Sequence, residues 1–141
     1  MAKKRITIPL FIPHSGCPHC CVFCNQWRVT GVSEKITTGT VHKTIERYLS
    51  AIPENVNKIE IAFFGGSFTA IPLDEQIEYL LSVQSYIDRG IIDSVRISTR
   101  PDYIDKNILN VLKKYHVETV ELGVQSFSDD VLNASGRGHN S

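Results

Sequence analysis

Four short apolar segments, each followed by a stretch with helical periodicity, constrain the fold of this chain more than any other feature. Apolar runs of this length indicate strands, and apolar residues recurring at i, i+4, i+7 and i+8 indicate one face of a helix. Strand followed by helix, four times over, predicts parallel strands joined by right-handed crossovers, and therefore an α/β domain. The expected strands cover residues 5–13, 58–64, 94–99 and 117–124, and the expected helices lie near residues 41–51, 74–90, 105–115 and 129–133.

The ends of these helices carry local signals. Pro53 ends the first helix, whereas Asp74 and Asp105 are placed to be N-caps of the second and third. Gly90 occupies the C-cap position of the second helix, and Ser128 is expected to cap the short fourth one. The side chains that we expect these helices to bury are Val41, Ile45, Tyr48, Leu49 and Ile52, then Ile77, Leu80, Leu81 and Ile87, then Ile108, Val111, Leu112 and Tyr115.

The composition is that of an ordinary globular domain. Of 141 residues, 42% are hydrophobic and 21% charged, which suits about one domain with a buried core. The 15 basic residues balance the 15 acidic ones, so the charge neither supports a nucleic-acid partner nor excludes one. The apolar run near the start is short and interrupted by Pro9 and Pro13, which favours a strand over an export signal, and no segment reaches membrane-spanning length.

All four cysteines lie in one loop directly after the first expected strand. Cys17, Cys21 and Cys24 have the spacing C-x3-C-x2-C, with which one loop can bring three thiolates to a polynuclear iron site and leave one iron open. With Cys20 the loop also contains two adjoining C-x2-C pairs, which are compatible with zinc, although structural zinc sites usually separate their pairs by about a dozen residues or more. A C-x-x-C redox pair is a third alternative. Cysteines crowded in this way fit a reducing cytoplasm better than a disulfide framework.

Residues suited to ligand binding follow the other three strands as well. Ligands of parallel α/β sheets and barrels bind at the carboxyl ends of the strands, so these segments should meet on one rim. Taken singly they are weak signals, because a glycine pair can be only a tight turn, and proline with aspartate is ordinary turn chemistry. Their convergence with the cysteine loop is the stronger argument for a site. The segments are residues 65–67 (GGS), 100–102 (RPD) and 125–126 (QS).

The cysteine spacing, with Phe23 just before the last cysteine, resembles the signature of the radical S-adenosylmethionine (SAM) enzymes. Further motifs in the expected order resemble the branch of that superfamily that contains the Elongator catalytic subunit and the oxygen-independent coproporphyrinogen oxidases. This resemblance implies a partial (β/α)6 barrel, here truncated to about four βα units. Residues 1–141 would then be the amino-terminal part of a radical SAM core domain. The motifs are residues 63–69 (FFGGSFT), 98–104 (STRPDYI), 121–127 (ELGVQSF) and 136–139 (GRGH).

The resemblance also assigns roles to particular residues. It implies that Cys17, Cys21 and Cys24 are the ligands of a 4Fe-4S cluster. Many relatives have a glutamate where this chain has Ser98, which puts a ribose contact from that strand in doubt. The residues expected to bind SAM are Gly65, Gly66 and Ser67 at its methionine moiety, Gln125 at its ribose or sulfonium, and Arg137 at its carboxylate.

The activity implied is reductive cleavage of SAM to methionine and a 5′-deoxyadenosyl radical, which abstracts hydrogen from a substrate that the residues do not reveal. A reduced flavodoxin or ferredoxin would donate the electron, and the cytoplasm would be the compartment. A truncated barrel is expected to self-associate through its open strand edge. The alternative from another class is a non-catalytic zinc-binding α/β module that uses the cysteine loop to bind a partner.

Overall fold

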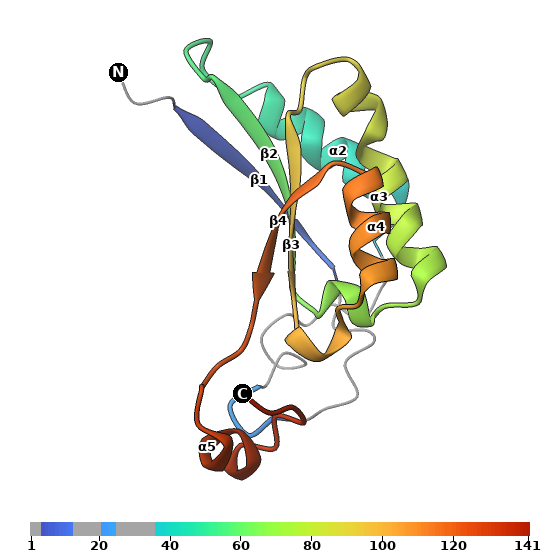
Figure 1. Cartoon of the computed structure of the whole chain (residues 1–141). Helices are drawn as coiled ribbons and strands as arrows, with labels where there is room; N and C mark the ends of the chain where they lie inside the picture. The colour runs from blue at the N-terminus through green and yellow to red at the C-terminus, as the bar shows by residue number, and fades with distance from the viewer. Residues whose placement is uncertain (1–3, 13–20, 25–35) are drawn as a thin grey trace.

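The computed structural model describes residues 4–12, 21–24 and 36–141, which form a four-stranded parallel sheet (Figure 1). The strands lie side by side in chain order, β1-β2-β3-β4, and every neighbouring pair is parallel. The sequence therefore predicted the α/β class and the strand direction correctly. The strands are β1 (Arg5–Phe11), β2 (Lys58–Phe64), β3 (Ser94–Thr99) and β4 (Val117–Leu122).

Three helices cover one face of this sheet, and a fourth lies beyond the carboxyl ends of the strands (Figure 1). The covering helices are α2 (Thr38–Leu49), α3 (Leu73–Asp88) and α4 (Lys106–Lys114). Short 3-10 turns η1 (Phe68–Ala70) and η2 (Pro101–Tyr103) follow β2 and β3, and α5 (Asp129–Ala134) follows β4. Each strand thus leads into a helix, as the predicted four βα units require. Within the described ranges no helix is long and apolar enough to cross a bilayer.

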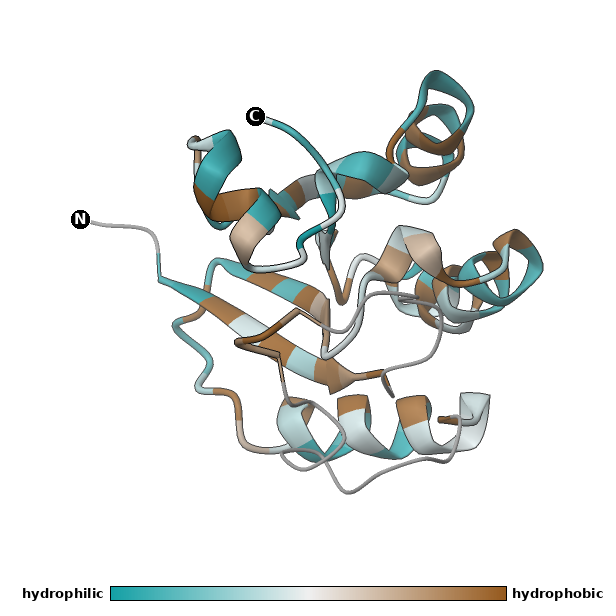
Figure 2. Cartoon of the chain, turned by 90° about the horizontal axis from the view of Figure 1, so that it is seen from below, coloured by the Kyte–Doolittle hydropathy of each residue, from teal (hydrophilic) through white to brown (hydrophobic). Residues whose placement is uncertain are grey.

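The core lies between the sheet and these helices. Ile8 and Leu10 of β1 and Ile61 and Phe63 of β2 point to this side and are almost fully buried. Because side chains alternate along a strand, the residues between them point to the opposite face. The banding of brown and paler residues along the strands in Figure 2 follows this alternation.

The opposite face of the sheet carries a line of charged side chains across all four strands, which we call the charged row: Arg5, Glu60, Arg96 and Glu121. The side chain of Glu60 is fully buried and accepts hydrogen bonds from Arg5 and, at 2.9 Å, from Arg96. Arg96 also donates to Glu121 on β4. Every charge of the row therefore has a partner of opposite sign.

Three details differ from the sequence-based expectations. Pro72 is the N-cap of α3, so Asp74 lies in the first turn, where its charge still favours the helix dipole. Leu81 is 54% exposed, because the buried face of α3 is formed by Tyr79, Leu80, Val83 and Tyr86 instead. In α4 only Leu112 is fully buried; Ile108 and Tyr115 are half-buried and pack against the core, and Val111 is half-buried.

The remaining caps and ends agree within a few residues: α2 ends at Leu49, before the predicted Pro53, and Arg89 rather than Gly90 is the C-cap of α3. Asp105 is the N-cap of α4, where its side chain accepts from the backbone N–H of Ile108 at 2.8 Å. Gly90 follows α3 with a φ of +70°, a conformation that glycine adopts without strain. Ser128 occupies the N-cap position of α5 without a side-chain hydrogen bond. Strands β1 and β4 end two residues earlier than predicted, and the predicted end of the first, Pro13, lies outside the described residues.

Candidate functional site

The short cysteine segment 21–24 lies at the carboxyl end of the sheet, beside α5 (Figure 1). The backbone N–H of Val22 donates to the carbonyl of Ser135 at 3.2 Å, and Cys24 N–H donates to Cys21 O at 2.9 Å, which forms a tight turn. The Cys21 side chain is buried, whereas Cys24 is half-buried. Cys17 and Cys20 lie outside the described residues.

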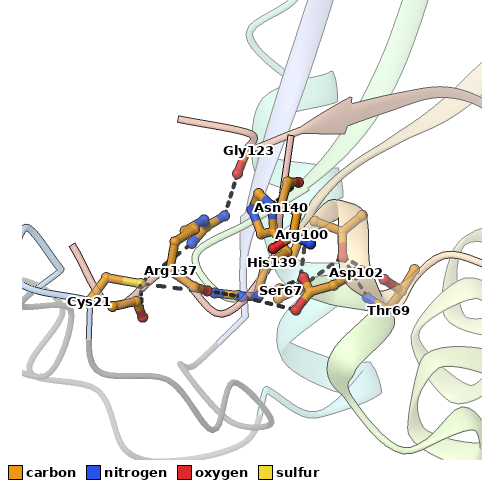
Figure 3. A network of polar contacts seen from close by, with 11 residues as sticks. Cys21, Ser67, Thr69, Arg100, Asp102, Gly123, Arg137, His139 and Asn140 are labelled. Carbon is orange, nitrogen blue, oxygen red and sulfur yellow. Dashed lines mark hydrogen bonds and ion pairs between the residues drawn. The ribbon is translucent and has the colours of Figure 1, made fainter. Parts of the chain in front are cut away.

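Two buried guanidinium groups converge on the sulfur of Cys21 (Figure 3). Arg137 Nη1 lies 3.7 Å from Cys21 Sγ, and Arg100 Nη1 lies 3.9 Å from it. These arginines come from different loops, one after β3 and one after α5. The Cys21 thiol is also 3.7 Å from the carbonyl oxygen of Gly136. Two cationic N–H groups from separate loops therefore face the buried cysteine sulfur.

The charges of the two arginines are balanced differently. Arg100 forms a bidentate pair with Asp102, with both N–O distances 2.9 Å, and donates to the backbone carbonyl of Arg137. Arg137 donates to the carbonyl of Gly123. Among the described residues, no carboxylate forms an ion pair with it. Its Nε is buried and has no hydrogen-bond acceptor there. Within the described residues this buried guanidinium therefore keeps one donor without an acceptor.

Asp102 stays ionised in this setting. Burial raises the pKa of its carboxyl, but the hydrogen bond from Arg100, a backbone hydrogen bond, and the charges of Arg100 and His139 together outweigh burial and lower the pKa below its ordinary value. The carboxylate therefore remains a counter-charge for Arg100 at neutral pH.

A group of buried hydroxyls holds Arg100 in place. Thr99 Oγ1 at the end of β3 lies 2.8 Å from Ser67 Oγ and 2.5 Å from Thr69 Oγ1, and accepts from the Thr69 N–H at 3.2 Å. Ser67 Oγ in turn accepts from the backbone N–H of Arg100 at 3.1 Å. The loops after β2 and β3 are thereby tied together. We call the whole set the rim network: Cys21, Ser67, Thr69, Thr99, Arg100, Asp102 and Arg137 (Figure 3).

Gly65 lies where β2 ends, in a conformation that residues with a side chain rarely adopt. Its φ is +113°, and a Cβ at this position would lie 2.3 Å from the carbonyl oxygen of Ile12 at the end of β1. The glycine therefore brings the loop after β2 against the chain that enters the cysteine loop. This close packing explains why position 65 is a glycine without any ligand, although the sequence suggested a contact to SAM there.

The comparisons with known proteins agree with this geometry. The profile of the Radical SAM superfamily matches residues 11–141, almost the whole chain. The chain belongs to the radical SAM superfamily. The family resemblance seen in the motifs is therefore confirmed.

Several radical SAM relatives are similar over large parts of this chain. Elongator complex protein 3 of Saccharomyces cerevisiae is 28% identical over 108 residues, which cover 64% of this chain and 19% of that protein. The heme chaperone HemW of Lactococcus lactis is 24% identical over 140 residues, 99% of this chain and 35% of the relative. The oxygen-independent coproporphyrinogen-III oxidase-like protein HemZ of Bacillus subtilis is 27% identical over 146 residues, 97% of this chain and 28% of the relative. The chain thus spans about a third of the length of these relatives or less.

A solved structure shows the same fold. The archaeal Methanocaldococcus infernus Elp3 with an N-terminal deletion superposes with a TM-score of 0.64 at 19% identity, covering 99% of this chain and 33% of that one. At this identity the likeness concerns the fold alone. It confirms the prediction of about four βα units of a radical SAM barrel.

The residues predicted to bind SAM are spread along the carboxyl rim of this radical SAM fold. Gly65 and Gly66 are half-buried, and the Ser67 hydroxyl is occupied by Thr99 and Arg100, so any ligand contact of Ser67 falls to its backbone. Gln125 is exposed and adopts a φ of +74°, which is uncommon outside glycine and is often found at functional sites. Their predicted roles remain predictions.

The sequence predicts the segment 100–102 as either a ligand-binding segment or an ordinary turn, and it includes Thr69 and Thr99 only as members of longer motifs. Their place at strand ends is the signal that could have identified them, because such residues meet on one rim. Ser98, where the family resemblance led us to expect a glutamate, donates to Glu121 on the neighbouring strand at 3.0 Å. A carboxylate therefore does lie beside this position, supplied by β4.

Proposed function

We propose that this chain forms the cluster-binding and SAM-binding part of a radical SAM enzyme. Cys17, Cys21 and Cys24 would hold a 4Fe-4S cluster, and SAM would bind between the cluster and the rim network. One observation carries the proposal: the buried sulfur of Cys21 lies at the carboxyl end of the sheet between two guanidinium groups. A residue that served only to fill the core would not need two cationic donors.

The described residues fit a cluster at this position. A thiolate ligand is anionic, and Arg100 and Arg137 supply positive charge and N–H groups on the side of Cys21 that faces the rim. Cys24 lies one tight turn after Cys21, so its sulfur would be able to bind the same cluster. Among the described residues no set of three metal-ligating side chains is found, and the other two cysteines lie outside them. A bound cluster would supply the electron that cleaves SAM to methionine and a 5′-deoxyadenosyl radical.

The protein residues have supporting tasks in this proposal. The unpaired Nε of Arg137 suits the carboxylate of SAM, because it offers a buried cationic donor that has no acceptor in the described part of the chain. Gly65 and Gly66 would offer their backbone groups to the methionine moiety of SAM at the end of β2, since neither has a side chain to cover them. Gln125 would offer its amide to the ribose. The sheet and the hydroxyls around Thr99 hold these groups in fixed relative positions.

The proposal names no substrate. The relatives are named for different proteins, a heme chaperone, an oxidase-like protein and an Elongator subunit, so similarity favours no single reaction. We further propose that a reduced flavodoxin or ferredoxin supplies the electron, that the enzyme acts in the cytoplasm, and that exposed sheet edges let this stretch of chain self-associate.

Addition of SAM to anaerobically reconstituted protein tests the proposal. We expect a brown protein whose visible absorption and electron paramagnetic resonance spectra change with SAM, because SAM would replace solvent at the open iron. Arg137→Gln should weaken this response several-fold while iron content stays close to that of the wild type. One zinc per chain without iron, or a cluster whose spectra ignore SAM, would contradict the proposal.

A further inference from the structure

Arg100 links the cysteine segment to the rest of the rim through the three nitrogens of its guanidinium group. Its Nε and Nη2 bind the two oxygens of Asp102, its Nη2 also donates to the carbonyl of Arg137, and its Nη1 lies 3.9 Å from Cys21 Sγ. The side chain is 3% exposed. One buried guanidinium therefore contacts the cysteine segment, the loop after β3 and the loop after α5 together.

The backbone of Arg100 is fixed independently of these contacts. Its N–H donates to Ser67 Oγ, which is held by Thr99 at the end of β3. The backbone of Arg100 is thus tied to the end of β3, and the pair with Asp102 holds the guanidinium beside Cys21.

Hydrogen bonds and positive charge beside a cysteine ligand stabilise the more negative, reduced state of an iron-sulfur cluster. Arg100 offers such a donor, and Asp102 partly cancels its charge through the bidentate pair. The two residues should therefore act on the cluster in opposite directions. Loss of the guanidinium removes stabilisation of the reduced state, whereas loss of the carboxylate leaves the guanidinium charge unbalanced.

We infer that Arg100 is a positioning residue that sets the reduction potential of the cluster held by Cys21, and that Asp102 limits its effect. This inference rests on the proposed function. The inference goes beyond the proposed function because it assigns control of the cluster's reduction potential to Arg100 and Asp102. These two residues are neither thiolate ligands nor proposed contacts to SAM.

The test is a spectroelectrochemical titration of the reconstituted protein, in which an electrode with mediators supplies one electron per cluster. Arg100→Gln should lower the potential and Asp102→Asn should raise it. Each change should alter the ratio of reduced to oxidised cluster at a fixed potential by about threefold to tenfold, where tenfold corresponds to about 59 mV for one electron. Arg96→Gln is the matched control, because Arg96 belongs to the charged row and pairs with Glu60 and Glu121. Its potential should equal that of the wild type.

The two variants separate tuning from damage to the fold, since a general loosening of the site would not shift the potential in opposite directions. If Arg100→Gln takes up no iron, Asp102→Asn decides alone, because it keeps the guanidinium in place. Equal potentials in wild type and Asp102→Asn at equal iron content, or shifts of the same sign in both variants, would overturn the inference. If the wild type takes up no iron, the proposed function fails and this inference with it.

Discussion

The charged row on the sheet and the rim network at the strand ends each contain two arginines, yet they differ in what balances those charges. In the charged row, the buried carboxylate of Glu60 lies between Arg5 and Arg96, and Glu121 takes the second face of Arg96. The hydrogen bonds from Arg96 and Ser98 lower the pKa of Glu121, so this carboxylate stays charged. The row is complete without a ligand.

In the rim network, by contrast, the described residues do not balance every charge. Asp102 balances Arg100, but for Arg137 no ion-pair partner is found in the part of the chain that the structure describes. Arg137 Nη1 lies 3.7 Å from the sulfur of Cys21 instead. The comparison shows that the chain can pair its buried charges fully where only stability is needed. Among the described residues the charge of Arg137 stays without a counter-charge, and this supports the proposed contact to an anionic ligand.

The largest expected effect comes from breaking the charged row. Glu60→Gln leaves two arginines without their shared carboxylate, and we expect the free energy of unfolding to fall by about 3 kcal/mol, measured by urea denaturation. The control is Glu118→Gln, which breaks the exposed pair with Lys58 and should cost about 0–1 kcal/mol. Similar losses in both variants would mean that the row is not a structural element.

An intermediate effect is expected at the rim, where Gly65 supports the network through its backbone. Gly65→Ala places a Cβ against the carbonyl oxygen of Ile12 at a positive φ, and should reduce the free energy of unfolding by about 2 kcal/mol. Gly90 also has a positive φ, +70°, but a Cβ there would meet no atom within 4 Å, so Gly90→Ala should cost about 1 kcal/mol. If both variants lose the same stability in urea denaturation, the close contact with Ile12 is not what requires a glycine.

The smallest effect concerns the pH dependence of the pair formed by Arg100 and Asp102. Because the folded state lowers the pKa of Asp102, its contribution to stability is fully present above the ordinary aspartate pKa of about 4 and is lost as the pH falls through the lower, folded value. The urea midpoint of the wild type should therefore fall more steeply below pH 4 than that of Asp102→Asn. Equal slopes would show that the pair does not contribute to folding.

Much of the fold could be predicted from the sequence, because local patterns decide it. The alternation of apolar strands with periodic helices and the N-cap Asp105 act over a few residues, and the structure confirms them. The buried face of α3 was harder to predict, because Leu80 and Leu81 are adjacent and either could face the core. In the structure Leu80 is buried together with Tyr79 and Tyr86, and Leu81 is exposed.

The candidate site was predictable in position but not in its contacts. Residues at four strand ends had to meet on one rim in a parallel sheet, and Arg100, Arg137 and Cys21 do meet there. Which hydroxyl binds which loop depends on atoms far apart in the sequence, as in the contact between Ser67 and Thr99. No local pattern contains that information.

The iron and sulfide content of the four single Cys→Ser variants after anaerobic reconstitution tests the central claim most directly. If Cys17, Cys21 and Cys24 complete the rim network as cluster ligands, wild type and Cys20→Ser should each hold about four iron atoms per chain. Serine at any of the other three positions should leave almost none, because a cluster held by two thiolates is labile. Equal loss of metal in all four variants, or one zinc per chain that depends on every cysteine, would contradict the account.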